Sequence, residues 1–69
     1  MERSELSERA EAIYAERLRH LVETEENIGK MLIIEVESGD YEIDKLGIES
    51  AHKLQALHPG APLYGIRIG

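Results

Sequence analysis

The first thirty residues carry the hydrophobic spacing of an amphipathic helix. Apolar residues return at steps of three and four, and the residues between them are mostly Glu and Arg. A 3.6-residue period places such positions on one face, and Gly29 is suited to end the helix because glycine accepts a left-handed conformation. We therefore predict a helix over about residues 4–26, with Ser4 as its N-cap. Its apolar stripe consists of Leu6, Ala10, Ile13, Tyr14, Leu18, Leu21 and Val22.

From Lys30 onwards the hydrophobic period changes to two, which predicts β-strands. A first strand with one wholly apolar face is followed by Ser38-Gly39-Asp40, a typical turn sequence, and by a second strand over residues 41–44. The turn can form a two-residue loop at positions 38–39, with Ile34 opposite Ile43, or at positions 39–40 with the same parity. Both registers stay open, and both place the glutamates of the hairpin on a face that must be wet. The apolar face consists of Leu32, Ile34 and Val36, and these glutamates are Glu35, Glu37 and Glu42.

Helical spacing returns over residues 46–57 and ends at His58-Pro59-Gly60, because proline cannot continue a helix. Alternation from Leu63 to the C-terminus predicts a third strand. A right-handed crossover through the second helix places that strand beside the first. We therefore predict a single α+β domain over residues 1–69: the N-terminal helix, then a ββαβ core over about residues 30–69 whose three-stranded antiparallel sheet has the order 2-1-3.

This arrangement leaves apolar surface that no element of the chain covers. We expect the second helix to cover the Leu32 face, and the N-terminal helix either to share that face or to cross to the back of the sheet. A chain of 69 residues buries a small core, so we predict a homodimer that uses the N-terminal helix, the edge of the third strand, or both. Two arginines that flank these apolar positions are included because they can anchor a partner. The predicted interface residues are Leu6, Ile13, Tyr14, Arg17, Leu21, Met31, Ile33, Leu63 and Arg67.

Composition narrows the classes of function. Fourteen acidic against eight basic residues give a formal net charge of −6, whereas proteins that bind nucleic acid cluster Lys and Arg. We therefore expect a basic protein as partner and no nucleic acid. The absence of Cys excludes thiolate zinc sites and thiol nucleophiles, and it favours a cytoplasmic location. No segment has the length and apolarity of a membrane span or a signal peptide.

The histidines give weak candidates for catalysis. Glu49 and His52 stand three apart in the second predicted helix, as in Glu-x-x-His metal ligation, which in helical bundles requires further carboxylates from other helices. His58 stands at the end of the same helix. A small metal-dependent or acid–base enzyme using Glu49, His52 and His58 is therefore the alternative hypothesis. A solvated helix face is the preferred interpretation, and we predict no enzymatic activity, metal or cofactor.

Two segments resemble a group of small, largely uncharacterised bacterial proteins that are common in cyanobacteria. In residues 26–43, Gly29-Lys30 precedes an apolar strand, and Ser38-Gly39-Asp40-Tyr41 forms the hairpin. Residues 58–69, from His58-Pro59-Gly60 to Arg67-Ile68-Gly69, are similar to the closing block of that group. Some of its members are regarded as antitoxin-like partners of small nuclease toxins. The resemblance implies a protein-binding, antitoxin-like role for this chain.

Overall fold

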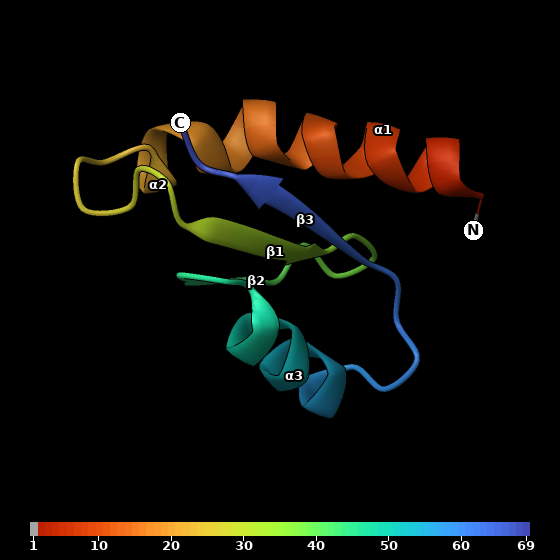
Figure 1. Ribbon diagram of the computed structural model, residues 1–69. Coiled ribbons are helices and arrows are strands. Elements are labelled where there is room, and N and C mark those ends of the chain that lie inside the picture. The colour runs from red at the N-terminus through yellow and green to blue at the C-terminus, as the bar shows by residue number, and fades with distance from the viewer. Residues whose placement is uncertain (1) are drawn as a thin grey trace.

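The computed structural model describes residues 2–69 and confirms the predicted α+β architecture (Figure 1). Its N-terminal helix is continuous but has three parts: α1 (Arg3–Ile13), the π-helical η1 (Tyr14–Leu18) and α2 (Arg19–Val22). The sheet is antiparallel throughout and has the predicted order β2-β1-β3. The remaining elements are β1 (Met31–Glu35), β2 (Tyr41–Asp44), α3 (Ile48–Leu57) and β3 (Leu63–Arg67).

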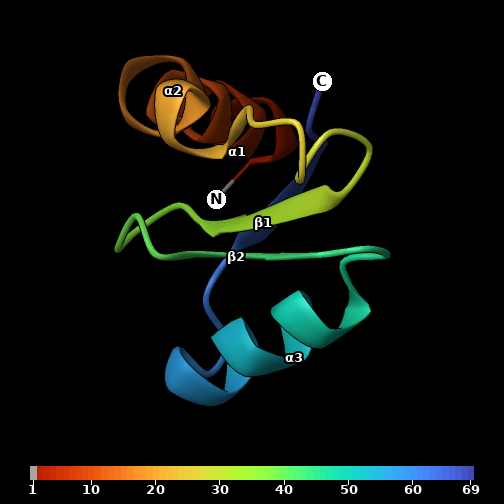
Figure 2. The ribbon, with the colours of Figure 1, turned by 90° about the vertical axis from the view of Figure 1, so that its left-hand side faces the viewer.

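The helices lie on opposite faces of the sheet (Figure 2). The N-terminal helix covers the Leu32 face, and α3 lies on the other face against β2 and β1. The prediction that the second helix covers the Leu32 face was therefore wrong. The N-terminal helix has the longer apolar stripe, whereas α3 buries only Ser50 and Leu54 and exposes Leu57. The main core consists of Ala10, Tyr14, Leu18, Val22, Leu32, Ile34, Val36 and Ile68.

The π-helical segment determines which side chains of the N-terminal helix are buried. Ala10, Tyr14, Leu18 and Val22 are buried at steps of four. A regular α-helix would rotate such residues about 40° per step, because it has 3.6 residues per turn. The N–H of Arg19 instead donates to the carbonyl of Tyr14, an i→i+5 bond that winds the helix more slowly and keeps these side chains over the sheet. For the same reason the predicted stripe residue Leu21 is 57% exposed.

This geometry predicts opposite outcomes for two neighbouring substitutions. Leu21→Ala is expected to change the free energy of unfolding by less than about 0.5 kcal/mol, because the side chain is in solvent. Val22→Ala is expected to cost at least about 1.5 kcal/mol, because it removes two buried methyl groups and leaves a cavity. Urea denaturation followed by circular dichroism measures both. A larger loss of stability for Leu21→Ala than for Val22→Ala would show that the helix packs without the π-helical segment.

The β1–β2 hairpin has a longer loop than either predicted one. Ile34 pairs with Tyr41, which leaves residues 36–39 as a four-residue loop. The N–H of Glu35 donates to the carbonyl of Asp40 at 2.8 Å and closes the hairpin. Both predicted two-residue loops were therefore wrong, although the predicted parity of the side chains is correct. The cause is a side-chain contact inside the loop, which belongs to the candidate site.

Candidate functional site

A buried carboxylate lies where the hairpin loop meets the end of α3. Glu35 is 1% exposed, and its Oε2 and Oε1 accept the N–H groups of Glu37 at 2.8 Å and Ser38 at 2.9 Å. The same Oε1 lies 3.9 Å from Nδ1 of His58, the residue that follows α3. The other ring nitrogen of His58, Nε2, is 2.6 Å from Oδ2 of Asp40. His58 therefore bridges two carboxylates, and we call these three residues the Glu35–His58–Asp40 cluster.

The prediction that Glu35 faces water was wrong, because α3 packs on its side of the sheet. Burial by itself would raise the pKa of Glu35. The hydroxyl of Ser38, the N–H groups of Glu37 and Ser38 and the adjacent His58 outweigh that effect and lower the pKa below its ordinary value. The carboxylate is therefore ionised at neutral pH. It holds the four-residue loop in shape and attaches that loop to the C-terminal end of α3.

The residues of the alternative enzyme hypothesis are not brought together. The side chains of Glu49 and His52 are exposed on α3 and make no hydrogen bond or ion pair with any residue in the range 2–69. His58, in contrast, contacts Glu35 and Asp40. In this described range no group of three His, Asp or Glu side chains could hold a metal ion. The geometry therefore gives the metal-site hypothesis no support.

The predicted interface residues occupy several environments. Tyr14 and Ile33 are each 8% exposed and buried within the monomer, so they are not available to a partner. Burial, together with a hydrogen bond from its hydroxyl to Glu23, raises the pKa of Tyr14. Leu6 and Ile13 are partly buried against the main core, to which Tyr14 belongs. The remaining predicted interface residues are exposed or half-exposed and do not pack against this core. They are Arg17, Leu21, Met31, Leu63 and Arg67.

Both predicted interface arginines lie against backbone of the same chain. Nη1 of Arg67 donates to the carbonyl oxygen of Gly29 at 2.8 Å. The guanidinium of Arg17 lies over the hairpin loop, where a Cβ at position 39 would be 2.6 Å from Nη1. Gly39 also has a φ of 83°, which favours glycine. A side chain at position 39 is therefore disfavoured both by conformation and by this arginine.

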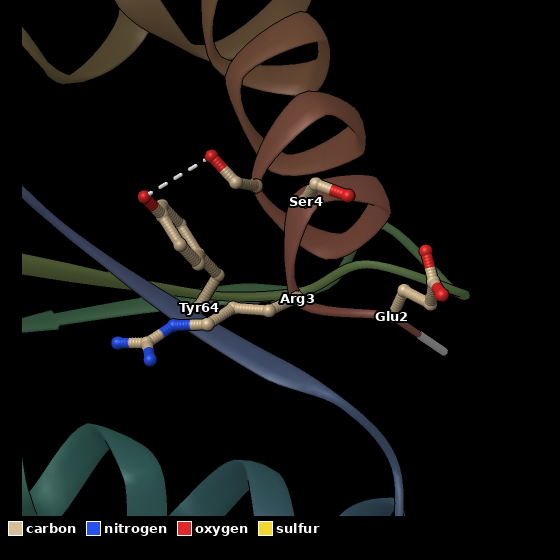
Figure 3. Close-up of a pocket in the computed structure, with 5 residues that line it drawn as sticks. Glu2, Arg3, Ser4 and Tyr64 are labelled. Carbon is tan, nitrogen blue, oxygen red and sulfur yellow. Dashed lines mark hydrogen bonds between the residues drawn. The ribbon is translucent and has the colours of Figure 1, made fainter.

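Two hollows on the surface of residues 2–69 are lined mainly by polar side chains. The larger, with a volume of about 710 Å³, is open and lies between the start of α1 and β3 (Figure 3). Across it, Oγ of Ser7 is 3.4 Å from the hydroxyl of Tyr64. The smaller, of about 140 Å³, lies between β2 and α3. Every buried side-chain N or O atom of the described residues has a hydrogen-bond partner, so neither hollow presents an unsatisfied one. The larger hollow is lined by Glu2, Arg3, Ser4, Ser7 and Tyr64.

Asp44, beside the smaller hollow, organises the start of α3. Its carboxylate accepts the N–H groups of Gly47 at 3.0 Å, Ser50 at 3.1 Å and Leu46 at 3.3 Å. The side chain of Ser50 and these N–H groups lower the pKa of Asp44. The bond to Ser50 satisfies one of the N–H groups that the first turn of α3 leaves without a partner. The carboxylate is thus already used by the fold.

The comparisons with known proteins add no identity to this geometry. The chain matches no protein-family model, no curated protein and no solved structure. The resemblance to small cyanobacterial-type proteins therefore stays a prediction. No helix in the described part of the chain has the length and apolarity needed to cross a membrane.

Proposed function

We propose that the protein is a non-enzymatic, dimer-forming protein-binding module whose acidic surface engages a basic protein, in the antitoxin-like role that the resemblance implies. One observation carries this proposal. Nine exposed carboxylates make no ion pair with any other residue between positions 2 and 69. They are Glu2, Glu5, Glu8, Glu11, Glu16, Glu25, Glu26, Glu37 and Glu49.

Most of these carboxylates lie in one layer of the molecule. Seven of the nine lie in the segment that runs from Glu2, the residue before α1, to the loop after α2, on the side of the sheet opposite α3 (Figure 2). Residues 2–29 hold eight carboxylates against four arginines, a net charge of −4. A net charge of one sign creates a potential that steers a partner of opposite sign, and such attraction weakens with added salt. The acidic layer therefore supports a basic protein surface as its partner.

Charge reversal on this layer tests the proposal. Affinity purification from the source cells at low and moderate salt is expected to recover a basic protein, whose affinity is then measured with both purified components. The double variant Glu8→Lys/Glu11→Lys is expected to weaken binding at least about tenfold, because it reverses two charges in the acidic layer. The matched variant Glu37→Lys/Glu49→Lys reverses two charges elsewhere and is expected to change the affinity less than about twofold.

Two outcomes contradict this proposal. Recovery of this chain alone at both salt concentrations would exclude a basic partner. Equal effects of the two double variants would show that the acidic layer is not the binding surface. A basic partner without nuclease activity would remove the antitoxin-like role and leave the protein-binding role in place.

A further inference from the structure

We propose that β3 pairs with β3 of a second copy of this chain, antiparallel about Gly65, so that two three-stranded sheets join into one. This inference deepens the proposed function, since it rests on the dimer and names the surface that forms it. β3 is an edge strand, because the strand order is β2-β1-β3. Edge strands present a row of free backbone N–H and C=O groups to other chains.

The hydrogen bonds to β1 show which backbone groups of β3 are free. The carbonyl of Pro62 accepts from Val36, and both the N–H and the carbonyl of Ile68 bond to residues at the start of β1. In an antiparallel pair, alternate residues bond to one neighbour and the residues between them point away. The backbone N–H and C=O groups of the even-numbered residues of β3 therefore point toward β1. The outward residues Leu63, Gly65 and Arg67 have no backbone partner within residues 2–69.

Of the features by which proteins prevent edge pairing, which include charged side chains, this edge has the charge of Arg67 at its end. Proline, inward-pointing charges, bulges and covering segments are the usual protection. β3 contains no proline, and its register with β1 runs without a bulge from Leu63 to Arg67. The middle outward residue, Gly65, is exposed and has no side chain to hold a second strand away. The edge is therefore open to another strand.

The distribution of charge selects the register. An axis through Gly65 uses all three outward residues and places Arg67 opposite Leu63 of the second copy. The two arginines of the dimer then stand at opposite ends of the strand pair, each opposite an uncharged leucine. An axis through Arg67 would instead place two guanidinium groups directly opposite each other, which is destabilising. Separation of these like charges thus favours the axis at Gly65 over an axis at Arg67.

The same axis also continues the apolar face of the sheet. Tyr64 and Ile66 lie on the side of the N-terminal helix and are half-buried in the monomer. In the proposed register Tyr64 stands opposite the second copy's Ile66, and the reverse contact forms across the axis. Pairs of an aromatic and a β-branched residue are among the favourable cross-strand pairs. A second copy therefore matches this edge in hydrogen bonds and apolar surface, and it places no like charges opposite each other.

Substitutions at Gly65 separate the backbone contact from all others. Gly65→Pro removes an outward N–H and no bond to β1, and edge strands tolerate such a proline. Gly65→Ala is the matched control, because it also places a Cβ 3.2 Å from Met31 and Ile33 but keeps the N–H. Sedimentation equilibrium is expected to show a dimer for the wild type and for Gly65→Ala. It is expected to show at least about tenfold weaker association for Gly65→Pro, because two intermolecular hydrogen bonds are lost.

A second pair of variants tests the register and remains informative if Gly65→Pro does not fold. Leu63→Lys places a like charge opposite Arg67, and Leu63→Glu places an opposite charge there, at equal loss of apolar surface. The Lys variant is expected to associate at least about fivefold more weakly than the Glu variant. In a dimer of mixed isotope labels, we also expect a nuclear Overhauser effect between the Hα atoms of Tyr64 and the second copy's Ile66.

The outcomes distinguish this inference from the proposed function. A dimer without that contact, in which Gly65→Pro behaves as Gly65→Ala, would overturn the β3 pairing and leave the dimer. A wild-type chain that is monomeric at millimolar concentration would overturn the dimer as a whole. Binding of a basic partner is measured separately, so its failure bears only on the partner in the proposed function.

Discussion

Replacing Glu35 by alanine is expected to lower the free energy of unfolding by about 2–4 kcal/mol at pH 7. The substitution leaves the N–H groups of Glu37 and Ser38 without the acceptor that now lies 2.8 Å and 2.9 Å away. It also removes the inner carboxylate partner of His58. A core of this size supplies only about 3–5 kcal/mol. The variant is therefore expected to lose about half or more of this stability, as measured by urea denaturation followed by circular dichroism.

The neighbouring Glu37 provides a matched control for this experiment. Its side chain is exposed and makes no hydrogen bond or ion pair with the other described residues. Glu37→Ala is therefore expected to change the free energy of unfolding by less than about 0.5 kcal/mol. Equal stability of the alanine variants at positions 35 and 37 would show that the buried carboxylate does not hold the loop.

The order of the elements could be predicted because its signals are local. A change of hydrophobic period from 3.6 to two near Lys30 marks the change from helix to strand. Pro59 ends α3 wherever that helix lies, and the structure ends it at Leu57. The strand order also followed, since a right-handed crossover leaves few positions for β3.

The covering of the sheet could not be predicted from the same patterns. Periodicity shows that a helix has an apolar side, but both faces of this sheet carry apolar residues. The pattern therefore does not indicate which helix covers which face. The exposure of Leu21 had a readable signal. Leu6, Ala10, Tyr14, Leu18 and Val22 stand at constant steps of four, a spacing that an α-helix of 3.6 residues per turn does not hold on one face.

The Glu35–His58–Asp40 cluster was missed for a related reason. The predicted parity correctly placed Glu35 beside Ile33 on the second face of the sheet. Whether that face is wet depends on α3, which is distant in sequence, and so does the arrival of His58. The local half of the cluster was readable, because a carboxylate shortly before a Ser-Gly-Asp turn can accept the N–H groups of the loop. That bonding also lengthens the loop to residues 36–39.

Acid is expected to unfold the protein, with stability falling as the pH drops below about 4.5, the ordinary range of a free glutamate. Hydrogen bonds and an adjacent imidazole lower the pKa of Glu35 in spite of burial, and the side chain of Ser50 with nearby N–H groups lowers that of Asp44. A carboxyl whose pKa is lower in the folded state contributes stability that is complete above its unfolded pKa. That contribution is lost as the pH falls through the folded pKa, because the unfolded chain then binds the proton more readily.

The contribution of Glu35 is separated by measuring the free energy of unfolding from pH 7 to pH 2 in matched variants. Glu35→Gln cannot titrate, so its curve is expected to lie below that of the wild type at pH 7 and to approach it as the pH falls. Asp44→Asn is expected to remove a separate part of the acid dependence, because its carboxylate acts at the start of α3, away from the loop. Glu37→Gln is expected to keep the wild-type profile. A Glu35→Gln curve that stays parallel to the wild type down to pH 2 would show that this buried carboxylate takes up no proton linked to unfolding, and acid sensitivity would then have to arise from the exposed carboxylates.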